Sequence, residues 1–170
     1  GDSMHPDLVD KITRVFPKKK LYIMYGQTEA SPRLTYLDPA KARKKPGSVG
    51  NAVPGVEVKI VNGMGRECAS GEEGEIIARG PNIMKGYWNE PEETAKAIRN
   101  GWLYTGDVGV RDAEGDIKIV GRKKDFLKIG ANRVNPLSIE EAITSIDGVR
   151  RGVVVDVPDE ILGTRLIFFI

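Results

Sequence analysis

The 170-residue chain has one cysteine, one histidine, only 6% aromatic residues and no long apolar run. Cys68 stands alone, so an intramolecular disulfide is impossible and a zinc cluster is unsupported. His5 also stands alone, which removes the usual general base for a serine or cysteine nucleophile unless it serves in that role itself. No apolar stretch approaches the roughly 18 residues of a membrane-spanning helix, and no signal segment opens the chain. We therefore expect a cytoplasmic protein without a membrane span.

Positive and negative charges are nearly balanced: 29% of the residues are charged, and the net charge is only +2. The basic clusters at residues 18–20 and 43–45 are local, and a solvated face is favoured over a nucleic-acid surface. We expect no nucleic-acid partner. Apolar content of 40% is typical of a soluble globular protein. A chain of this length holds one ordinary domain, or one domain and part of another.

The stretch 102–122 predicts a hairpin with polar residues at its two outer ends. Residues 108–111 and 117–120 are short apolar-rich runs, and the turn-forming residues 112–116 separate them. Such a hairpin would return Arg122 to the neighbourhood of Asp107. A carboxylate that accepts and a guanidinium that donates could together hold the paired hydroxyls of a sugar. The alternative is a surface ion pair of little energetic value, and local chemistry alone favours it.

A second polar cluster follows an apolar run near the start of the chain. Residues 6–16 have the pattern of an amphipathic helix, and residues 21–25 that of a buried strand. Gln27, Thr28 and Glu29 come directly after this strand, where open α/β sheets usually bind ligands. The alternative is structural: Tyr25 as a core aromatic, Thr28 as a turn hydroxyl and Glu29 as a solvated acid.

The rest of the chain predicts a mixed α+β fold. We expect a surface loop over residues 32–46 and an antiparallel pair of strands at 56–61 and 75–79. We expect helices at 89–99, capped by Asn89, and at 135–147, capped by Asn135. Two strands at 149–157 and 162–170 would flank a turn at 158–159. The glycines of 47–55 could cradle a phosphate, but no Gly-Lys-Ser/Thr ending follows, and turn sterics explain them equally well.

Several motifs in order resemble those of one enzyme superfamily. They are Tyr25-Gly26-Gln27-Thr28-Glu29, Gly74-Glu75-Ile76, the run from Gly80 to Trp88, Trp102 to Asp107, Gly121 to Gly130, and Val134-Asn135-Pro136. In this order and spacing the chain resembles the adenylate-forming superfamily of AMP-forming acyl-CoA synthetases, luciferases and non-ribosomal peptide adenylation domains. The resemblance runs nearly end to end, and it is to the middle and late part of a much longer enzyme.

The resemblance implies roles for both polar clusters. The first motif, Tyr25 to Glu29 with Gly26 and Gln27 inside it, would bind ATP or AMP. Its aromatic ring would lie along adenine, the Thr28 hydroxyl would bind a phosphate oxygen, and Glu29 would help to hold Mg²⁺. Thr28 and Glu29 would thus be the catalytic residues. Asp107 would receive the ribose hydroxyls, with Arg122 beside it.

The resemblance also implies a hinge and a thiol-acceptor site. Lys124 stands at the hinge position of the family, about which a small C-terminal domain turns between two half-reactions; otherwise it is a solvated lysine. The positions near the pantetheine arm and coenzyme A are Gly130, Ala131, Asn132 and Arg133. The commoner pattern carries two glycines here, and Ala131 replaces one, which leaves the acceptor contact less certain.

The expected protein is a fragment of an acyl-CoA synthetase. The family's phosphate loop and late catalytic lysine would lie outside this chain, so the fragment alone should lack adenylation activity. Residues 1–120 would be the end of the large AMP-binding domain, with an antiparallel, barrel-like sheet subdomain and flanking helices. Residues 121–170 would be the hinge and the first half of a small α+β domain. A fatty or aryl acid would be the substrate, and exposed sheet edges predict self-association.

Two alternatives to this function remain open at the level of the sequence. One is an adenylation enzyme that loads a carrier-protein phosphopantetheine instead of coenzyme A. The other is a nucleotide-binding or assembly module without catalysis of its own.

Overall fold

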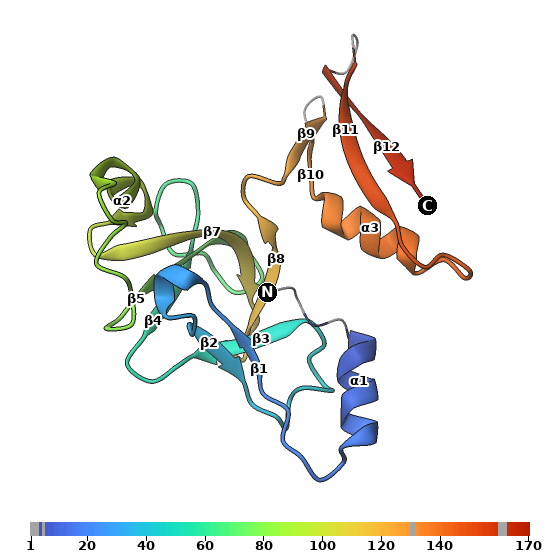
Figure 1. Cartoon of the computed structure of the whole chain (residues 1–170), viewed down its shortest axis with the longest axis horizontal. Helices are drawn as coiled ribbons and strands as arrows, with labels where there is room; N and C mark the ends of the chain where they lie inside the picture. Colours follow the sequence, from blue (N-terminus) through green and yellow to red (C-terminus); the bar gives the residue numbers. More distant parts are fainter. Residues whose placement is uncertain (1–3, 5, 130–131, 160–162) are drawn as a thin grey trace. The chain divides into compact units, whose positions relative to one another are not determined.

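The computed structural model describes residues 4, 6–129, 132–159 and 163–170. The chain divides into two compact units, Gly1–Val120 and Gly121–Ile170. Helices and antiparallel strands occur in both units, so the predicted α+β class is confirmed (Figure 1). Within the described residues, no helix is both long enough and apolar enough to cross a lipid bilayer.

The first unit is built on an eight-stranded sheet whose neighbouring strands run antiparallel. The strand order is β1 (Ile23–Tyr25), β2 (Thr35–Leu37), β3 (Ser48–Ala52), β8 (Ile117–Arg122), β7 (Trp102–Arg111), β5 (Glu73–Arg79) and β4 (Glu57–Val61), and β6 (Ile98–Arg99) pairs with β7. Helices α1 (Pro6–Val15) and α2 (Pro91–Ala97) and the 3-10 turn η1 (Thr28–Ala30) complete the unit. The sheet joins neighbours in sequence, except where β3 meets β8 and β7 meets β5.

Alternating apolar residues form the main core of this unit. The predicted pairing of β4 with β5 is confirmed, with Val58 opposite Ala78 and Ile60 opposite Ile76. These four side chains belong to one buried cluster together with Ala30, Leu34, Leu103 and Ile117. The 3-10 turn therefore packs on the same core as the central strands, because Ala30 is fully buried in it.

The surface loop predicted for residues 32–46 is wrong in its first part. Residues Thr35–Leu37 form β2, and Leu34, Thr35 and Leu37 are completely buried. The Thr35 hydroxyl donates to the carbonyl of Val49 on β3 at 2.7 Å, which satisfies it inside the core. A strand of three residues among prolines and lysines gives too short a periodic signal to read from sequence.

We expected the apolar run at residues 21–25 to be a buried strand, but it is only partly buried. Strand β1 lies at one end of the strand order and pairs antiparallel with β2, so its other edge pairs with no strand of this sheet. Tyr22 and Met24 are 48% and 46% exposed. Ile23 points inward and packs with Val9 of α1 and with Leu37 and Ala42. Among the described side chains of α1, Val9 is the deeply buried one, while Leu8 and Val15 are exposed, as is Phe16 just after the helix.

The helix predicted at 89–99 is shorter than expected at both ends. Asn89 has a φ of 55° and does not cap it, and the residue at the N-cap position is Glu90. Helix α2 ends at Ala97, because Ile98 and Arg99 turn into β6 and pair with Leu103 and Trp102. The next strand begins from this tight turn.

An ionic cluster ties the turn between β7 and β8 to the segment after β2. The Lys45 ammonium lies 2.7 Å from Asp112 Oδ2 and also bonds Asp116, and Lys41 lies 2.7 Å from Asp116 Oδ2. Burial alone would raise the pKa of Asp116, but both lysines outweigh it and hold this pKa below its usual value. The hydrogen bond from Lys45 likewise lowers the pKa of Asp112. Asp112 Oδ1 also accepts the backbone N–H groups of Glu114 and Asp116, which confirms the predicted turn.

The second unit contains two small antiparallel pairs and a helix. They are β9 (Leu127–Ile129) with β10 (Asn132–Val134), α3 (Pro136–Thr144), and β11 (Val153–Asp159) with β12 (Gly163–Phe169). The predicted cap of the helix is confirmed, since Asn135 Oδ1 accepts the Leu137 N–H at 3.1 Å. The turn predicted at 158–159 is wrong, because Pro158 and Asp159 pair with Thr164 and Gly163 inside the hairpin.

Candidate functional site

The segment after β1 turns sharply and presents the polar residues of the first motif. Gly26 is required there, because a Cβ atom on it would lie 2.2 Å from the carbonyl oxygen of Pro32. The 3-10 turn follows at once, with Gln27 in extended conformation at its N-cap. Gln27 and Glu29 are half-buried and Thr28 is exposed. The hydroxyl of Thr28 is therefore accessible to a ligand.

Asp107 is a carboxylate held inside the sheet. It lies in the middle of β7, and only 6% of its surface is exposed. Its backbone N–H donates to the hydroxyl of Thr105, which donates in turn to the carbonyl of Ile76 on β5. Gly106 between them has a φ of 75°, a conformation that favours glycine. The local backbone therefore sets the direction of the Asp107 side chain.

Tyr25 and Asp107 join the two polar clusters that the sequence kept apart. The Tyr25 hydroxyl donates to Asp107 Oδ2 at 2.6 Å. A phenol bonded to a carboxylate makes a charge-assisted hydrogen bond, which is stronger than one between neutral groups. The end of β1 and the middle of β7 thus form one site, with the Tyr25 ring and the Asp107 carboxylate side by side.

The segment from Gly80 to Tyr87 braces the loop that carries Glu29. Asn82 Nδ2 donates to the carbonyls of Ala30 and Arg33 at 3.0 and 2.6 Å. The Met84 N–H donates to the carbonyl of Glu29, and the Ser31 hydroxyl donates to that of Asn82.

At the end of the same segment, Tyr87 holds the carboxylate of Glu29. The Tyr87 hydroxyl donates to Glu29 Oε1 at 2.7 Å. This bond, together with burial and the nearby negative charges, raises the pKa of Tyr87 above its ordinary value. Tyr87 and Asn82 belong to the run from Gly80 to Trp88, but the sequence alone assigns neither of them a role. Their spacing from Glu29, more than 50 residues, leaves no local signal of the contact.

The residues of the expected hinge and acceptor site lie in the second unit. Arg122 and Lys124 are exposed, and the proximity of Arg122 to Asp107 stays a prediction. Gly130 and Ala131 lie outside the described residues. Asn132 and Arg133 begin β10, where their backbones pair with Ile129 and Lys128 of β9. The coenzyme A role of these four residues is likewise a prediction.

Glu29 offers the one carboxylate in this loop for a cation. Its Oε2 atom has no hydrogen-bond donor among the described residues, whereas Oε1 is engaged by Tyr87. The described part of the chain contains no group of three or more acidic, histidine or cysteine residues that could hold a metal ion. Mg²⁺ in nucleotide sites is commonly held by one or two carboxylates, with phosphates and waters as the other ligands. The residues present therefore fit Mg²⁺ bound together with a phosphate.

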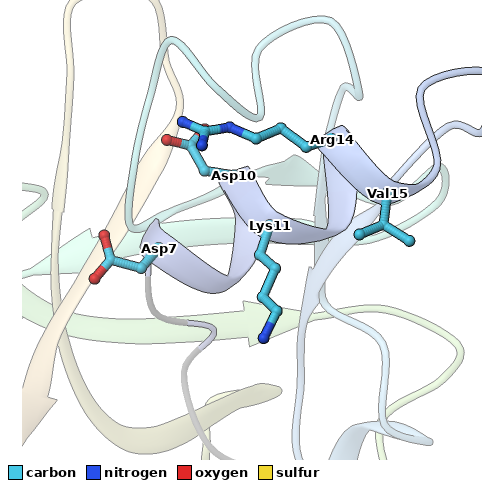
Figure 2. A pocket seen from close by; sticks show the side chains of 5 residues that line it. All are labelled: Asp7, Asp10, Lys11, Arg14 and Val15. Atoms are coloured by element: carbon cyan, nitrogen blue, oxygen red, sulfur yellow. The ribbon is translucent and has the colours of Figure 1, made fainter.

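A shallow hollow on the surface of α1 does not resemble this site. Figure 2 shows that one helix supplies its lining, which consists of Asp7, Asp10, Lys11, Arg14 and Val15. Asp10 pairs with Arg43 at 3.3 Å. Three of the four charged residues are exposed on the helix surface, and nothing in the lining converges on a ligand.

The structure places the phenol of Tyr25 against the buried Asp107, and the turn that carries Thr28 and Glu29 follows Tyr25 directly. A family model described as "AMP-binding enzyme" matches residues 1–88, and the chain belongs to this family. The resemblance found in the sequence is thereby confirmed.

Individual relatives within the family are acyl-CoA ligases. The chain is 42% identical over 152 residues to a long-chain-fatty-acid–CoA ligase of Bacillus subtilis, a match that covers 89% of this chain and 27% of that protein. It is 39% identical over 135 residues to a feruloyl-CoA synthase of Amycolatopsis sp, covering 79% and 28% respectively. Among solved structures, O-succinylbenzoate coenzyme A synthetase from Bacillus subtilis in complex with AMP is 29% identical, with a TM-score of 0.85. That match covers 99% of this chain and 34% of the other.

The chain therefore spans about a quarter to a third of the length of these relatives.

Proposed function

We propose that this chain is part of an AMP-forming carboxylate–CoA ligase and supplies its nucleotide site. The observation that carries the proposal is the bonded pair of Tyr25 and Asp107, with 2.6 Å between the phenol and carboxylate oxygens. An apolar ring face suits adenine, and a fixed carboxylate beside it suits the two ribose hydroxyls as an acceptor. The family to which the chain belongs supports this assignment.

The reaction would proceed in two steps. In the first, a carboxylate oxygen attacks the α-phosphorus of ATP, a new P–O bond forms, and pyrophosphate leaves with the electrons of the broken P–O bond. In the second, the sulfur of a thiol attacks the acyl carbonyl, a C–S bond forms, AMP leaves, and the thiol proton passes to solvent. Coenzyme A is the proposed thiol, and residues 130–133 are the proposed acceptor segment.

The residues of the site would serve the first of these steps. Thr28, exposed on the turn, would donate to a phosphate oxygen, and Glu29 would hold Mg²⁺ through its open carboxylate oxygen. The cation would reduce the negative charge on the phosphates when bound. Asp107, Arg122 and Tyr25 would bind and orient the nucleoside, with Gly26 and Gln27 shaping the loop. Lys124 would serve as the hinge between residues 1–120 and 121–170.

The substrate, the compartment and the activity of the isolated chain belong to the same proposal. Relatives named for long-chain fatty, ferulic and indoleacetic acids favour a fatty or aryl carboxylic acid. We place the protein in the cytoplasm. Since the chain spans about a quarter to a third of its relatives, we expect it to bind nucleotide without adenylation activity of its own.

Calorimetric titration of the chain with AMP, repeated with Asp107→Ala, tests the proposal. Saturable binding that the substitution reduces at least tenfold would support a ribose site at Asp107. Binding that is indifferent to Asp107→Ala, or no binding by the folded chain, would contradict a nucleotide site within this chain. Pyrophosphate exchange is measured in parallel, and its absence beside AMP binding would agree with a binding module alone.

A further inference from the structure

We infer that Tyr87 is a positioning residue for Glu29, holding one carboxylate oxygen so that the other faces the cation of a bound Mg²⁺–nucleotide. The inference rests on the proposed function, because it gives a role to a neighbour of the proposed cation ligand. It concerns a contact between two segments 58 positions apart in the chain.

The geometry assigns the two carboxylate oxygens different tasks. Oε1 accepts the phenol proton of Tyr87 at 2.7 Å, while Oε2 receives no hydrogen bond from the described residues. A glutamate side chain has three rotatable bonds, and a free one would sample many directions. With one oxygen fixed, the remaining lone pairs keep one direction, and the carboxylate is prepared for monodentate binding of a hard cation.

The backbone of Tyr87 is itself held in place by Thr94. Its backbone N–H donates to the Thr94 hydroxyl at 2.8 Å, and that hydroxyl donates to the carbonyl of Glu90. The preceding Gly86 has a φ of 156°, and a Cβ atom there would lie 2.8 Å from the Thr94 methyl carbon. The phenol therefore projects from an anchored segment rather than from a free loop.

The backbone of Glu29 is fixed by the same segment. The Met84 N–H donates to the Glu29 carbonyl at 2.8 Å, and Asn82 bonds the carbonyl of Ala30. Main chain and side chain of Glu29 thus have separate donors, Met84 and Tyr87, from one stretch of four residues. This arrangement favours a role in orientation over a chance surface contact.

The test compares Mg²⁺–ATP with AMP, because binding of AMP needs no cation. Calorimetry would measure both affinities for the wild-type chain, Tyr87→Phe and Glu29→Gln. Tyr36→Phe is the matched control, since its exposed phenol makes no described contact with the site. We expect Tyr87→Phe to weaken Mg²⁺–ATP about fivefold and to leave AMP within about twofold. Glu29→Gln should weaken Mg²⁺–ATP at least as much.

A purely structural role of Tyr87 would lower both affinities together, and that result would overturn the inference, as would unchanged Mg²⁺–ATP affinity. Glu29→Asp serves as a second variant should Tyr87→Phe not fold. It keeps the charge but withdraws the carboxylate from the phenol, and it should show the same selective loss. If the wild-type chain does not bind AMP at all, that result would instead contradict the proposed function. Wild-type AMP binding with no gain from Mg²⁺ for ATP would overturn only the cation site, and this inference with it.

Discussion

Tyr25 donates its phenol hydrogen bond to Asp107 across 82 positions of the chain. The contact links the end of β1 with the middle of β7, which do not neighbour each other in the sheet. The carboxylate is almost completely buried and the phenol half-buried, so water screens this bond only weakly. The site is therefore a property of the folded sheet and not of either motif by itself.

Removing the Tyr25 hydroxyl should weaken nucleotide binding without unfolding the chain. Tyr25→Phe keeps the ring for adenine but leaves Asp107 without its phenol donor. A hydrogen bond to a charged group contributes roughly 1.5–3 kcal/mol to stability. Only the part of this energy that orients the carboxylate affects ligand binding, so we expect about a fivefold loss of AMP affinity. Calorimetry would measure it, with Tyr22→Phe as the control on an exposed tyrosine. Unchanged affinity would show that the phenol does not orient Asp107.

Removing the Asn82 amide should loosen the loop that carries Glu29. Asn82→Ala deletes two donors and leaves the carbonyls of Ala30 and Arg33 without them. We expect the free energy of unfolding to fall by about 2 kcal/mol, measured by urea denaturation. The exposed Asn132 provides a control substitution, Asn132→Ala, in the other unit. A loss no larger than that of the control would contradict a bracing role.

The ionic cluster should make stability fall at both ends of the pH range. The pKa values of Asp112 and Asp116 are lower in the folded chain than their ordinary value of 3.8. Both carboxylates therefore stabilise the fold at a pH above 3.8, and this stabilisation is lost as the pH falls through their pKa values in the folded chain. The pKa values of Lys41 and Lys45 are higher in the folded chain than their ordinary value of 10.5. Both ammonium groups therefore stabilise the fold at a pH below 10.5, and this stabilisation is lost as the pH rises through their pKa values in the folded chain. Melting temperatures measured between pH 2 and 12 would show both limbs, with a plateau from about 5 to 9.

Asp116→Asn should remove most of the loss of stability at low pH that this ionic cluster causes. Asp116 is 4% exposed and bonds Lys41, Lys45 and the Asn51 amide. Loss of its charge leaves two ammonium groups facing a neutral amide, and we expect the melting temperature at pH 7 to fall by roughly 5 °C. Glu92→Gln on the exposed face of α2 is the control for the loss of a carboxylate. An equal change in the two variants would contradict a special role of the cluster.

The exposed face of β1 should promote self-association. Met24 lies opposite Tyr36 on β2, and Tyr22 packs against Tyr36 with 6.2 Å between ring centroids. All three side chains are exposed, and β1 is at the end of the strand order. Met24→Lys should shift the chain toward monomer in sedimentation experiments at micromolar concentrations. Lys20→Met, which adds an apolar side chain two residues before Tyr22, should act in the opposite direction.

Periodic and strongly punctuated segments were predictable from the sequence, while short and long-range features were not. The β4–β5 pair followed from strict alternation, and the Asn135 cap from a polar residue before Pro136. Strand β2 was missed because Thr35–Leu37 is too short to show a period. The burial of β1 was overestimated, since an apolar run does not reveal whether a second layer covers its outer face.

The candidate site divides in the same way. Residues of the first motif and Asp107 could be singled out because the order and spacing of the motifs resemble those of the adenylate-forming superfamily, whereas local chemistry alone favoured a structural role. Their partners could not: Tyr87 meets Glu29, and Asn82 meets Ala30, only after several strands have paired. The spacing of these residues obeys no helical or strand period, so one sequence by itself holds no record of the contacts.

The pairing of β3 with β8 has a consequence for how the first unit folds. Ser48 on β3 donates to the carbonyl of Ile117 across 69 positions, whereas β4 and β5 pair over a short connection. Contacts between distant residues require closure of long loops and form slowly. During synthesis, the β4–β5 hairpin can form as soon as residue 79 is free, but β1 to β3 must wait for residue 117 before they join it. In a nascent chain the contact between Tyr25 and Asp107 would thus form late.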